Sequence, residues 1–505
     1  MLDDEKDPRL AYPEPSPRVG VNDASLERGS PDGGTGTGTS NDTPDPAPGV
    51  SERKLKWKLD LFILPLLASI FFLAVIGQSN IGNAYQAGMN KDLGLSAKMF
   101  ANVNSLFFVG YVVGQLPGTL LLRQLGPQRQ FAGAMISWGL LTIGASYAKN
   151  YATLVVCRVL IAVTESLIQG AVLYLSFWYR YEELATRASV LSATNALAGA
   201  FSGLLAYAIQ KDLDGRNGWS AWRWIFFIEG ILPVGWSIVI LLLLPSTPNS
   251  IRHGFSQKEK TVLLQRAASA HNTGDNRIVP KLILKVLVDP QFWLIAFIQG
   301  GMLVCSSSTA NFLPAIMAGL GYEGVQAQLM TVIPYAVSFF SILIICRLSD
   351  MSRLRGVWVL GGCLVTAIGY IVLLTVTNLA GRLVATCLIT AGANAPATIC
   401  FAWMASANVG YTFRGSALAM INIVAHLASL GAQQAFVDPP LYHRGETVAL
   451  AVVVFTAALT VVLMFYFRWM NAKKTREQHS EKADKLRPLS IDEIGNKHPD
   501  FFFSF

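Results

Sequence analysis

Charged residues are scarce in this sequence of 505 residues: they make up 14% of the chain, whereas hydrophobic residues make up 52%. A soluble globular chain carries about 25% charged residues, so too few charges are present to cover the surface of a soluble enzyme of this length. Disordered and fibrous classes are also excluded, because such sequences are poor in apolar residues or strictly periodic. The composition therefore indicates an integral membrane protein. The net charge of +8 is assigned to basic loops and not to a nucleic-acid partner.

The sequence also lacks the motifs of metal sites, cofactor sites and ATP-driven pumps. Its six cysteines fall in apolar stretches without the paired spacing of a zinc or redox site, so we expect small buried side chains. Neither a Gly-x-x-x-x-Gly-Lys-Ser/Thr loop nor a His-Glu-x-x-His motif is present. We therefore expect no metal, no cofactor and no enzymatic activity. Any transport must be facilitated or driven by an ion gradient.

The first 50 residues differ in kind from the rest of the chain. They are rich in Pro, Gly, Ser, Thr and Asp, and they lack apolar periodicity. Such a segment cannot bury enough apolar surface to become ordered. We expect residues 1–55 to form a disordered cytoplasmic tail without a cleavable signal peptide.

From residue 59 onward, twelve apolar segments of about 20 residues alternate with polar loops. Backbone groups in lipid must be satisfied within the segment, which predicts helices and excludes isolated strands. The predicted spans are 59–78, 98–121, 129–148, 152–178, 186–209, 223–244, 291–314, 327–347, 355–376, 381–404, 414–436 and 446–469. They divide the chain into a first half at 56–245, a central loop at 246–290, a second half at 291–470 and a C-terminal tail at 471–505.

A weak internal repeat relates the first and seventh spans. Asn83 is followed by Leu-Gly and a span that ends at Arg123, and Asn311 is followed by Leu-Gly and a span that ends at Arg347. The predicted fold class is thus an all-α integral membrane protein with twelve transmembrane helices in two six-helix halves. This is the architecture of the major facilitator superfamily.

Lysine and arginine residues predict the orientation of the chain. With both termini cytoplasmic, the cytoplasmic loops and flanks hold 23 of these residues and the opposite side holds 8. The positive-inside rule favours that topology. Part of the central loop, at 257–270, has helical periodicity that is typical of a helix lying along the membrane surface.

Ionisable side chains inside spans are few. Inserting one at mid-membrane costs about 2.5–3.5 kcal/mol of free energy, so a functional role is the first hypothesis for each. Arg158 and Glu165 in the fourth span are seven residues apart, which places them on one helix face about 10 Å apart. That separation is too long for an ion pair. It suits an anion held by Arg158 while Glu165 exchanges a proton. The alternative is that each pairs with a neighbouring helix and locks the bundle.

Two further ionisable residues lie in spans. Glu229 in the sixth span is interpreted as a packing or gating contact, because sixth spans are peripheral in this architecture. His426 is the histidine of the eleventh span, and its ordinary pKa near neutrality would let it titrate. A neutral, hydrogen-bonded histidine is the alternative.

Polar uncharged residues of the spans are candidates for hydrogen bonds to a solute. Each could equally make an interhelical contact. The candidates are Gln78, Asn80, Asn83, Gln169, Asn311 and Asn422. After the eighth span, Asp350, Arg353 and Arg355 form an acidic and basic cluster that resembles the superfamily's loop motif. That resemblance implies that the cluster braces the two halves when the cytoplasmic side is closed.

Several stretches of the chain carry a resemblance to one known family: 79–84, 91–95, Arg158 with Glu165 and 176–179, 222–230 and 438–445. These stretches resemble the fungal allantoate permease family of anion:cation symporters, and the resemblance runs over residues from about 56 to 476. The family usually has Asp-Arg just before the first stretch, whereas this chain has Gly77 and Gln78. It also has Gln169 in place of a usual proline and His426 in place of a common asparagine. The loss of the acid and base at Gly77 and Gln78 implies weaker binding of an anion or a different substrate, and Gln169 adds polarity to the cavity.

The residues and the resemblance together predict a secondary transporter of a small organic solute, with an organic anion or vitamin-like carboxylate as the expected substrate. Proton-coupled uptake by alternating access is the expected mechanism. Export of a secondary metabolite or drug is the first alternative, and a nutrient sensor that does not transport is the second. The expected partners are the solute, protons and the lipid bilayer, without nucleic acid. We expect a monomer in the plasma membrane.

Overall fold

The structure is a computed structural model. It describes residues 51–247, 255–269, 280–319, 325–376, 378–408, 410–433 and 443–478, with single positions at 435 and between 480 and 503. Several sequence expectations fall outside these residues. They are the tail before residue 51, the middle of the central loop at 270–279 and most of the last external loop at 438–442.

The helices of the first half follow the apolar segments closely. They are α1 (Glu52–Ala84), α3 (Ala97–Leu125), α4 (Pro127–Ser146), α5 (Tyr151–Ser166), α7 (Tyr181–Leu213) and α8 (Ala221–Leu243). The short turns between them are η2 (Tyr85–Met89), α2 (Asn90–Asp92) and η4 (Arg216–Gly218). The fourth span is not one regular helix, because the 3-10 turn η3 (Leu167–Gly170) separates α5 from α6 (Ala171–Leu175). The sequence did not predict this break, which places Gln169 in the irregular turn.

The second half and the central segment complete the helices. They are α9 (Gln257–Ser269), α10 (Pro280–Val288), α11 (Pro290–Gly319), α12 (Val325–Ser352), α13 (Arg355–Thr375), α14 (Leu379–Ala407), α15 (Tyr411–Gln433) and α16 (His443–Glu477). The helix expected at 257–270 is α9, and Lys58 of α1 donates to its Glu259 at 2.9 Å. Hydrogen bonding to Lys58 holds the pKa of Glu259 below its usual value. Helix α10 was not predicted.

Eleven helices among the described residues are long and apolar enough to cross a membrane. Helix α4 is the remaining long helix. Its first turn contains Gln128, Arg129 and Gln130, which lower the mean hydropathy of its 20 residues. It nevertheless packs along α8 and α5 like the other spans. The all-α fold with twelve spans is therefore as predicted, with helices that run a few residues beyond the apolar segments.

Local sequence signals set the helix ends. Gly126 ends α3 with a φ of +81°, a conformation that favours glycine, and Pro127 opens α4. Asn150 caps the start of α5, where its side chain accepts a hydrogen bond from the backbone N–H of Thr153 at 2.9 Å. Asn378 caps α14 in the same way and accepts from Gly381 at 2.7 Å. These caps satisfy donors that a helix start leaves unpaired.

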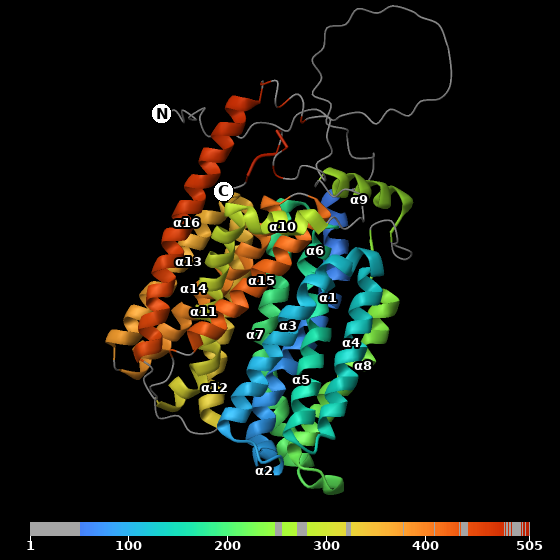
Figure 1. The fold of residues 1–505 in the computed structure, drawn as a ribbon, viewed down its shortest axis with the longest axis vertical. Helices are drawn as coiled ribbons and strands as arrows, with labels where there is room; N and C mark the ends of the chain where they lie inside the picture. Colours follow the sequence, from blue (N-terminus) through green and yellow to red (C-terminus); the bar gives the residue numbers. More distant parts are fainter. Residues whose placement is uncertain are drawn as a thin grey trace, which may run out of the picture. The chain divides into compact units, whose positions relative to one another are not determined.

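The helices pack within two groups and meet along two lines (Figure 1). Helices α1, α3, α4, α5, α7 and α8 form the first group, and α11 to α16 form the second. Across the groups, α7 packs against α12 and α14, and α3 packs against α15. In Figure 1, α9 and α2 mark opposite ends of the bundle, called here the α9 end and the α2 end.

Glycines allow the closest approaches inside the first group. A Cβ at Gly139 of α4 would lie 2.7 Å from the carbonyl oxygen of Gly230 in α8, and a Cβ at Gly230 would lie 2.8 Å from that of Gly139. Real Cβ atoms do not come so close to backbone atoms. The two glycines therefore fix the distance between α4 and α8.

Candidate functional site: a cavity between the two halves

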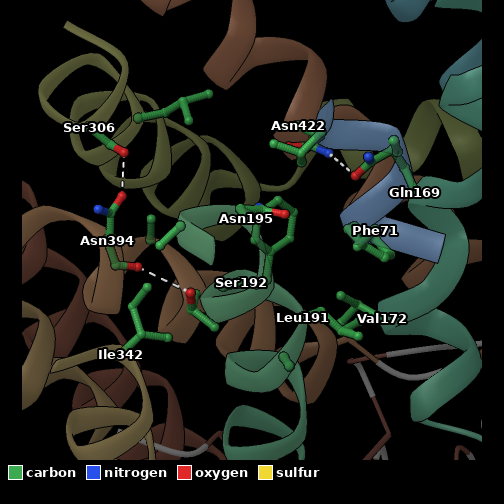
Figure 2. Close-up of a pocket in the computed structure, with 18 of the residues that line it drawn as sticks. Phe71, Gln169, Val172, Leu191, Ser192, Asn195, Ser306, Ile342, Asn394 and Asn422 are labelled. Carbon is green, nitrogen blue, oxygen red and sulfur yellow. Dashed lines mark hydrogen bonds between the residues drawn. The ribbon is translucent and has the colours of Figure 1, made fainter. Parts of the chain in front are cut away.

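A cavity of about 280 Å³ lies where the two helix groups meet. Its wall combines α1, α3, α7 and the η3–α6 turn of the first group with α11, α12, α14 and α15 of the second. Figure 2 shows side chains from both groups turned towards this space. A site that is shared between two packed units can change shape when the units move relative to each other, as in transporters built from two halves.

Hydrogen bonds organise the polar part of the wall (Figure 2). Asn422 of α15 donates to Oε1 of Gln169 in η3 at 3.1 Å, a contact that joins the two groups. Asn394 of α14 donates to Ser338 Oγ of α12 at 2.7 Å and accepts a hydrogen bond from Ser306 of α11. The wall therefore presents pre-oriented amides and hydroxyls, which suits hydrogen bonding to a polar solute.

The lining residues that the structure describes include no Asp, Glu, Lys or Arg. Amide, hydroxyl, imidazole and apolar groups make up the wall. The polar members are Gln78, Tyr111, Gln169, Ser192, Asn195, Gln299, Ser306, Ser338, Asn394, Thr398, Asn422 and His426. In this conformation, a solute in the cavity meets hydrogen-bonding groups and aromatic rings but no formal charge.

Glu165 lies directly behind this wall. It is 2% exposed, and its carboxylate accepts a hydrogen bond from the side chain of Gln78, which lines the cavity. Gln78 thus connects a buried acid to the cavity. The structure brings Glu165 and Gln78 together, a contact that the sequence did not predict.

Arg158 does not line the cavity. Its guanidinium donates to Oδ1 of Asn80 at 3.2 Å and to the carbonyl oxygen of Gly77 at 3.5 Å. It also lies over the ring of Phe107, with 4.6 Å between Cζ and the ring centroid. These contacts with α1 and α3 correspond to the alternative considered for this residue. The structure places neither Arg158 nor Asn80 against the cavity.

Glu229 is buried in the interior of the first group at 4% exposure. The groups that face it are Asn80 of α1 and Arg158 of α5. Glu229 is not among the described residues that line the cavity. This neighbourhood could not be recognised from the sequence, because Glu229 is 71 positions from Arg158 and 149 positions from Asn80.

The remaining candidates are divided between the wall and the helix contacts. His426 lines the cavity and packs against the rings of Phe108 and Tyr111, with centroids 5.6 and 5.4 Å away. Asn83 donates to Ser202 Oγ of α7 at 3.0 Å and so holds α1 against α7. The side chain of Asn311 lies outside the described residues.

A second cluster joins the two groups at the α9 end. Asp350 of α12 accepts hydrogen bonds from the backbone N–H and the hydroxyl of Thr186 at the start of α7, both at 2.6 Å. Arg355 lies 3.8 Å from the Asp350 carboxylate and donates to Ser406 Oγ at 3.0 Å. Arg353 occupies the left-handed region with a φ of 57° in the turn between α12 and α13.

Tyr411 adds another contact between the groups at this end. Its hydroxyl donates to the carbonyl oxygen of Leu120 at 2.8 Å and accepts from the backbone N–H of Arg123 at 3.0 Å. Tyr411 begins α15, and the other two residues lie near the end of α3. Hydrogen bonds therefore join the two groups along both lines of contact at the α9 end.

Several lining residues were not singled out from the sequence. They are Phe71, Tyr111, Ser192, Asn195, Ser306, Ser338, Thr398 and Phe401. On α7, the lining positions 188, 191, 192, 195 and 196 follow the three-to-four spacing of one helix face. That spacing was available in the sequence, but small polar residues are common in spans and did not identify the face by themselves.

Comparisons with known proteins give the family. The model of the Major Facilitator Superfamily matches residues 67–432. The chain belongs to the major facilitator superfamily. It is 34% identical over 442 residues to the MFS transporter prlL of Fungal sp. (strain NRRL 50135), covering 85% of this chain and 89% of that protein.

Two further likenesses bear on function and fold. The chain is 29% identical over 461 residues to a high-affinity nicotinic acid transporter of Saccharomyces cerevisiae, covering 90% of this chain and 85% of that one. Its fold is similar to the solved structure of the proton:xylose symporter XylE, with a TM-score of 0.63, 16% identity and coverage of 83% and 96%. The chain is thus a multi-pass membrane transporter of the superfamily.

Proposed function

We propose that this superfamily transporter carries a small organic solute through the cavity by alternating access. The observation that carries the proposal is the cavity itself, whose wall is divided between two helix groups that contact each other through separate hydrogen-bonded clusters. Rocking of one group against the other would expose the same wall to each side in turn. Uptake of a labelled solute panel into a host without its own related permeases tests this, with an empty-vector strain as control.

Proton coupling at Glu165 is part of the proposal. Its carboxylate is buried and hydrogen-bonded to Gln78 of the cavity wall, so its protonation state and the arrangement of that wall are linked. Glu165→Gln should abolish accumulation driven by a pH gradient and leave solute exchange. Accumulation that persists when the gradient is collapsed would contradict proton coupling, and loss of folded protein in Glu165→Gln would support a structural role instead.

For the substrate, an organic anion or vitamin-like carboxylate is the first candidate, supported by the likeness to a transporter named for nicotinic acid. Membership of the allantoate permease family is proposed on the same basis. The uncharged lining favours a second candidate, a neutral polar solute. Nicotinic acid and its amide form a matched pair that differs in charge. Transport of the acid alone supports the first candidate, and transport of the amide alone supports the second.

Uptake is the proposed direction, and export of a metabolite is the alternative. The α9 end is proposed as cytoplasmic, because it carries the basic loops of the positive-inside pattern. A plasma-membrane monomer is proposed with it. Protease accessibility of epitope tags at both termini, in intact and permeabilised cells, tests the orientation. Efflux from preloaded cells that exceeds the control strain would favour export.

Closure of the α9 end by Asp350 and its neighbours is the proposed gate. Asp350, Arg355 and Tyr411 supply the hydrogen bonds and ion pair of the gate. Arg353 lies in the turn between α12 and α13, with a backbone φ of 57°. Opening of this end would have to break the Asp350–Thr186 contact between α12 and α7. The Asp350 variants described in the Discussion test this role.

A further inference from the structure

The chain folds back onto the bundle after α16. The described residues of this C-terminal segment are Asn496, His498, Pro499 and 501–503. Phe501 is 8% exposed and Phe503 is 4% exposed. A segment that follows the last helix of a domain is poorly ordered unless specific contacts hold it. Burial of its aromatic rings indicates a docked segment.

Lys474 near the end of α16 binds the backbone of the C-terminal segment. Its ammonium donates to the carbonyl oxygens of Asn496 and Phe501, at 2.6 Å each. A third hydrogen bond goes to the carbonyl oxygen of His498 at 3.2 Å. An ammonium has three donors, and here all three are used on the same short stretch of backbone.

Phe503 docks on the preceding turns of α16. The side chain of Asn471 donates to the carbonyl oxygen of Phe503 at 2.8 Å and accepts from its backbone N–H at 2.9 Å. The Phe503 ring stacks on Phe467, with centroids 4.8 Å apart and 5° between the planes. Phe467 in turn contacts Trp403 of α14 at 5.8 Å between centroids. The segment is therefore held by both backbone pairing and ring packing.

Asn496 joins the C-terminal segment to the end of α14. Its side chain donates to Oδ1 of Asn408, the residue after α14, at 3.0 Å. Asn408 is 2% exposed, accepts a second hydrogen bond from Gln291 of α11 at 3.0 Å and donates to the carbonyl oxygen of Met404 at 2.7 Å. The segment therefore links the end of α16 to the start of the connection between α14 and α15.

The stretch 406–411 around Asn408 carries a residue of each cluster that joins the two helix groups. Ser406 accepts the hydrogen bond of Arg355, the partner of Asp350. Tyr411 makes the hydrogen bonds to the end of α3. Opening of the α9 end would release Tyr411 from α3. A contact that holds this stretch in its closed position opposes that release, because it favours one of the two arrangements.

We propose that the C-terminal segment is a strap that holds the stretch 406–411 and favours closure of the α9 end. Lys474 and Asn471 anchor the strap on α16, and the hydrogen bond from Asn496 to Asn408 transmits its effect. Release of the strap shifts the transporter towards the arrangement that is open at the α9 end. This inference rests on the gate proposed above for that end.

Hydrogen exchange of the full-length protein in lipid measures docking of the strap. The backbone N–H of Phe503 is hydrogen-bonded to Asn471, so its exchange should be slow in the wild type. Lys474→Ala should accelerate it about tenfold, the factor that corresponds to one hydrogen bond to a charged group at the lower end of its range. Lys473→Ala is the matched control, because the neighbouring ammonium lies 5.7 Å from the ring centroid of Trp469.

The effect on the gate is measured by maleimide labelling of a cysteine at Ala188 of the cavity wall, in a variant without the native cysteines. Asn496→Ala, and a chain that stops after residue 495, should each be labelled about fivefold faster from the α9 side. That factor corresponds to the loss of one neutral hydrogen bond. Lys473→Ala should be labelled at the wild-type rate.

Several outcomes overturn the proposal. Rapid exchange of Phe503 in the wild type would show that the segment is not docked. An unchanged or lower labelling rate in both Asn496→Ala and the shortened chain would show that it does not favour closure, and faster labelling from both sides would show general loosening. If the shortened chain folds poorly, Asn496→Ala alone decides, because it keeps the anchor on α16. An effect of Asp350→Ala without one of Asn496→Ala refutes the strap and leaves the gate, whereas no effect of Asp350→Ala refutes the gate itself.

Discussion

Removal of the Asp350 carboxylate should open the α9 end of the transporter. Asp350 is 6% exposed and accepts two hydrogen bonds of 2.6 Å from Thr186 across the line where α12 meets α7. A hydrogen bond to a charged group contributes about 1.5–3 kcal/mol. Two bonds at the lower value contribute roughly 3 kcal/mol to the closed arrangement, which is about a 100-fold change in the ratio of closed to open protein.

Asp350→Asn is a milder substitution that should weaken the same hydrogen bonds without removing them. The asparagine keeps one acceptor oxygen but loses the charge, and charge-assisted hydrogen bonds are roughly twice as strong as neutral ones. We expect about half of the effect of Asp350→Ala, which is roughly a tenfold shift in the same ratio.

The assay is labelling of a cysteine at Ala188, a cavity-lining position of α7, in a variant without the six native cysteines. A membrane-impermeant maleimide is applied to sealed vesicles of each orientation. Asp350→Ala should increase the labelling rate from the α9 side and decrease it from the α2 side, because the two openings exclude each other. Glu183→Ala is the control. This acid lies at the same end, but its 2.5 Å ion pair with Lys56 joins α1 to α7 within one group.

Equal labelling rates in Asp350→Ala and the wild type would refute the assignment of this cluster as the gate. An increase from both sides at once would instead indicate a general loosening of the bundle. In that case the hydrogen bonds of Asp350 stabilise the fold and do not select one conformation.

Three further predictions concern packing, the cavity and the α2 end. Gly139→Ala should lower the thermal unfolding temperature, since the added Cβ would lie 2.7 Å from the Gly230 carbonyl oxygen and overpacking costs about 1–3 kcal/mol. Gly133→Ala on the same helix is the control, because a Cβ there would have no atom within 4 Å. Each of the single variants Asn422→Ala and Gln169→Ala should raise the KM for the transported solute. The free-energy change in the double variant should be smaller than the sum of the two single changes, because both remove the same 3.1 Å hydrogen bond; a double-mutant cycle measures this. Strict additivity would contradict that coupling. Hydrogen bonds from Ser220 and Trp222 hold the pKa of Asp92 below its usual value. Its stabilisation is therefore present above about pH 3.9, the ordinary aspartate value, and is lost as pH falls through the lowered one. Asp92→Asn should unfold at a lower temperature than the wild type at pH 7 and approach it in acid, and a constant difference at every pH would argue against this origin.

The helices of this protein follow from simple properties of the chain. Each apolar segment long enough to cross the hydrocarbon is a helix, because a backbone in lipid has no other way to pair its polar groups. Helix α4 shows the limit of this argument. Its polar first turn lowers its apolar character, and only its packing against α8 shows that it lies in the bundle with the other spans. Helix α10 and the break at η3 have no comparable sequence signal, and both were missed.

The candidate site was only partly accessible from sequence. The hypothesis that Glu165 communicates with the cavity depended on its being an acid within a span, and the hydrogen bond from Gln78 gives that hypothesis a physical connection. The expectation that Arg158 reaches a substrate depended on the same argument. Its contacts with Asn80 and Gly77 instead direct it towards α1, away from the cavity wall.

The sequence by itself determined that this is a membrane protein with two sets of helices and with few charges inside its spans. The scarcity of charge and the lengths of apolar segments are properties of the chain that do not depend on how the helices pack. Only the tertiary structure decided which faces meet. It directed Arg158 towards α1 and away from the cavity, and it gathered an uncharged wall from both halves. These outcomes depend on the rotation of each helix about its axis, which is set by contacts between residues far apart in the chain.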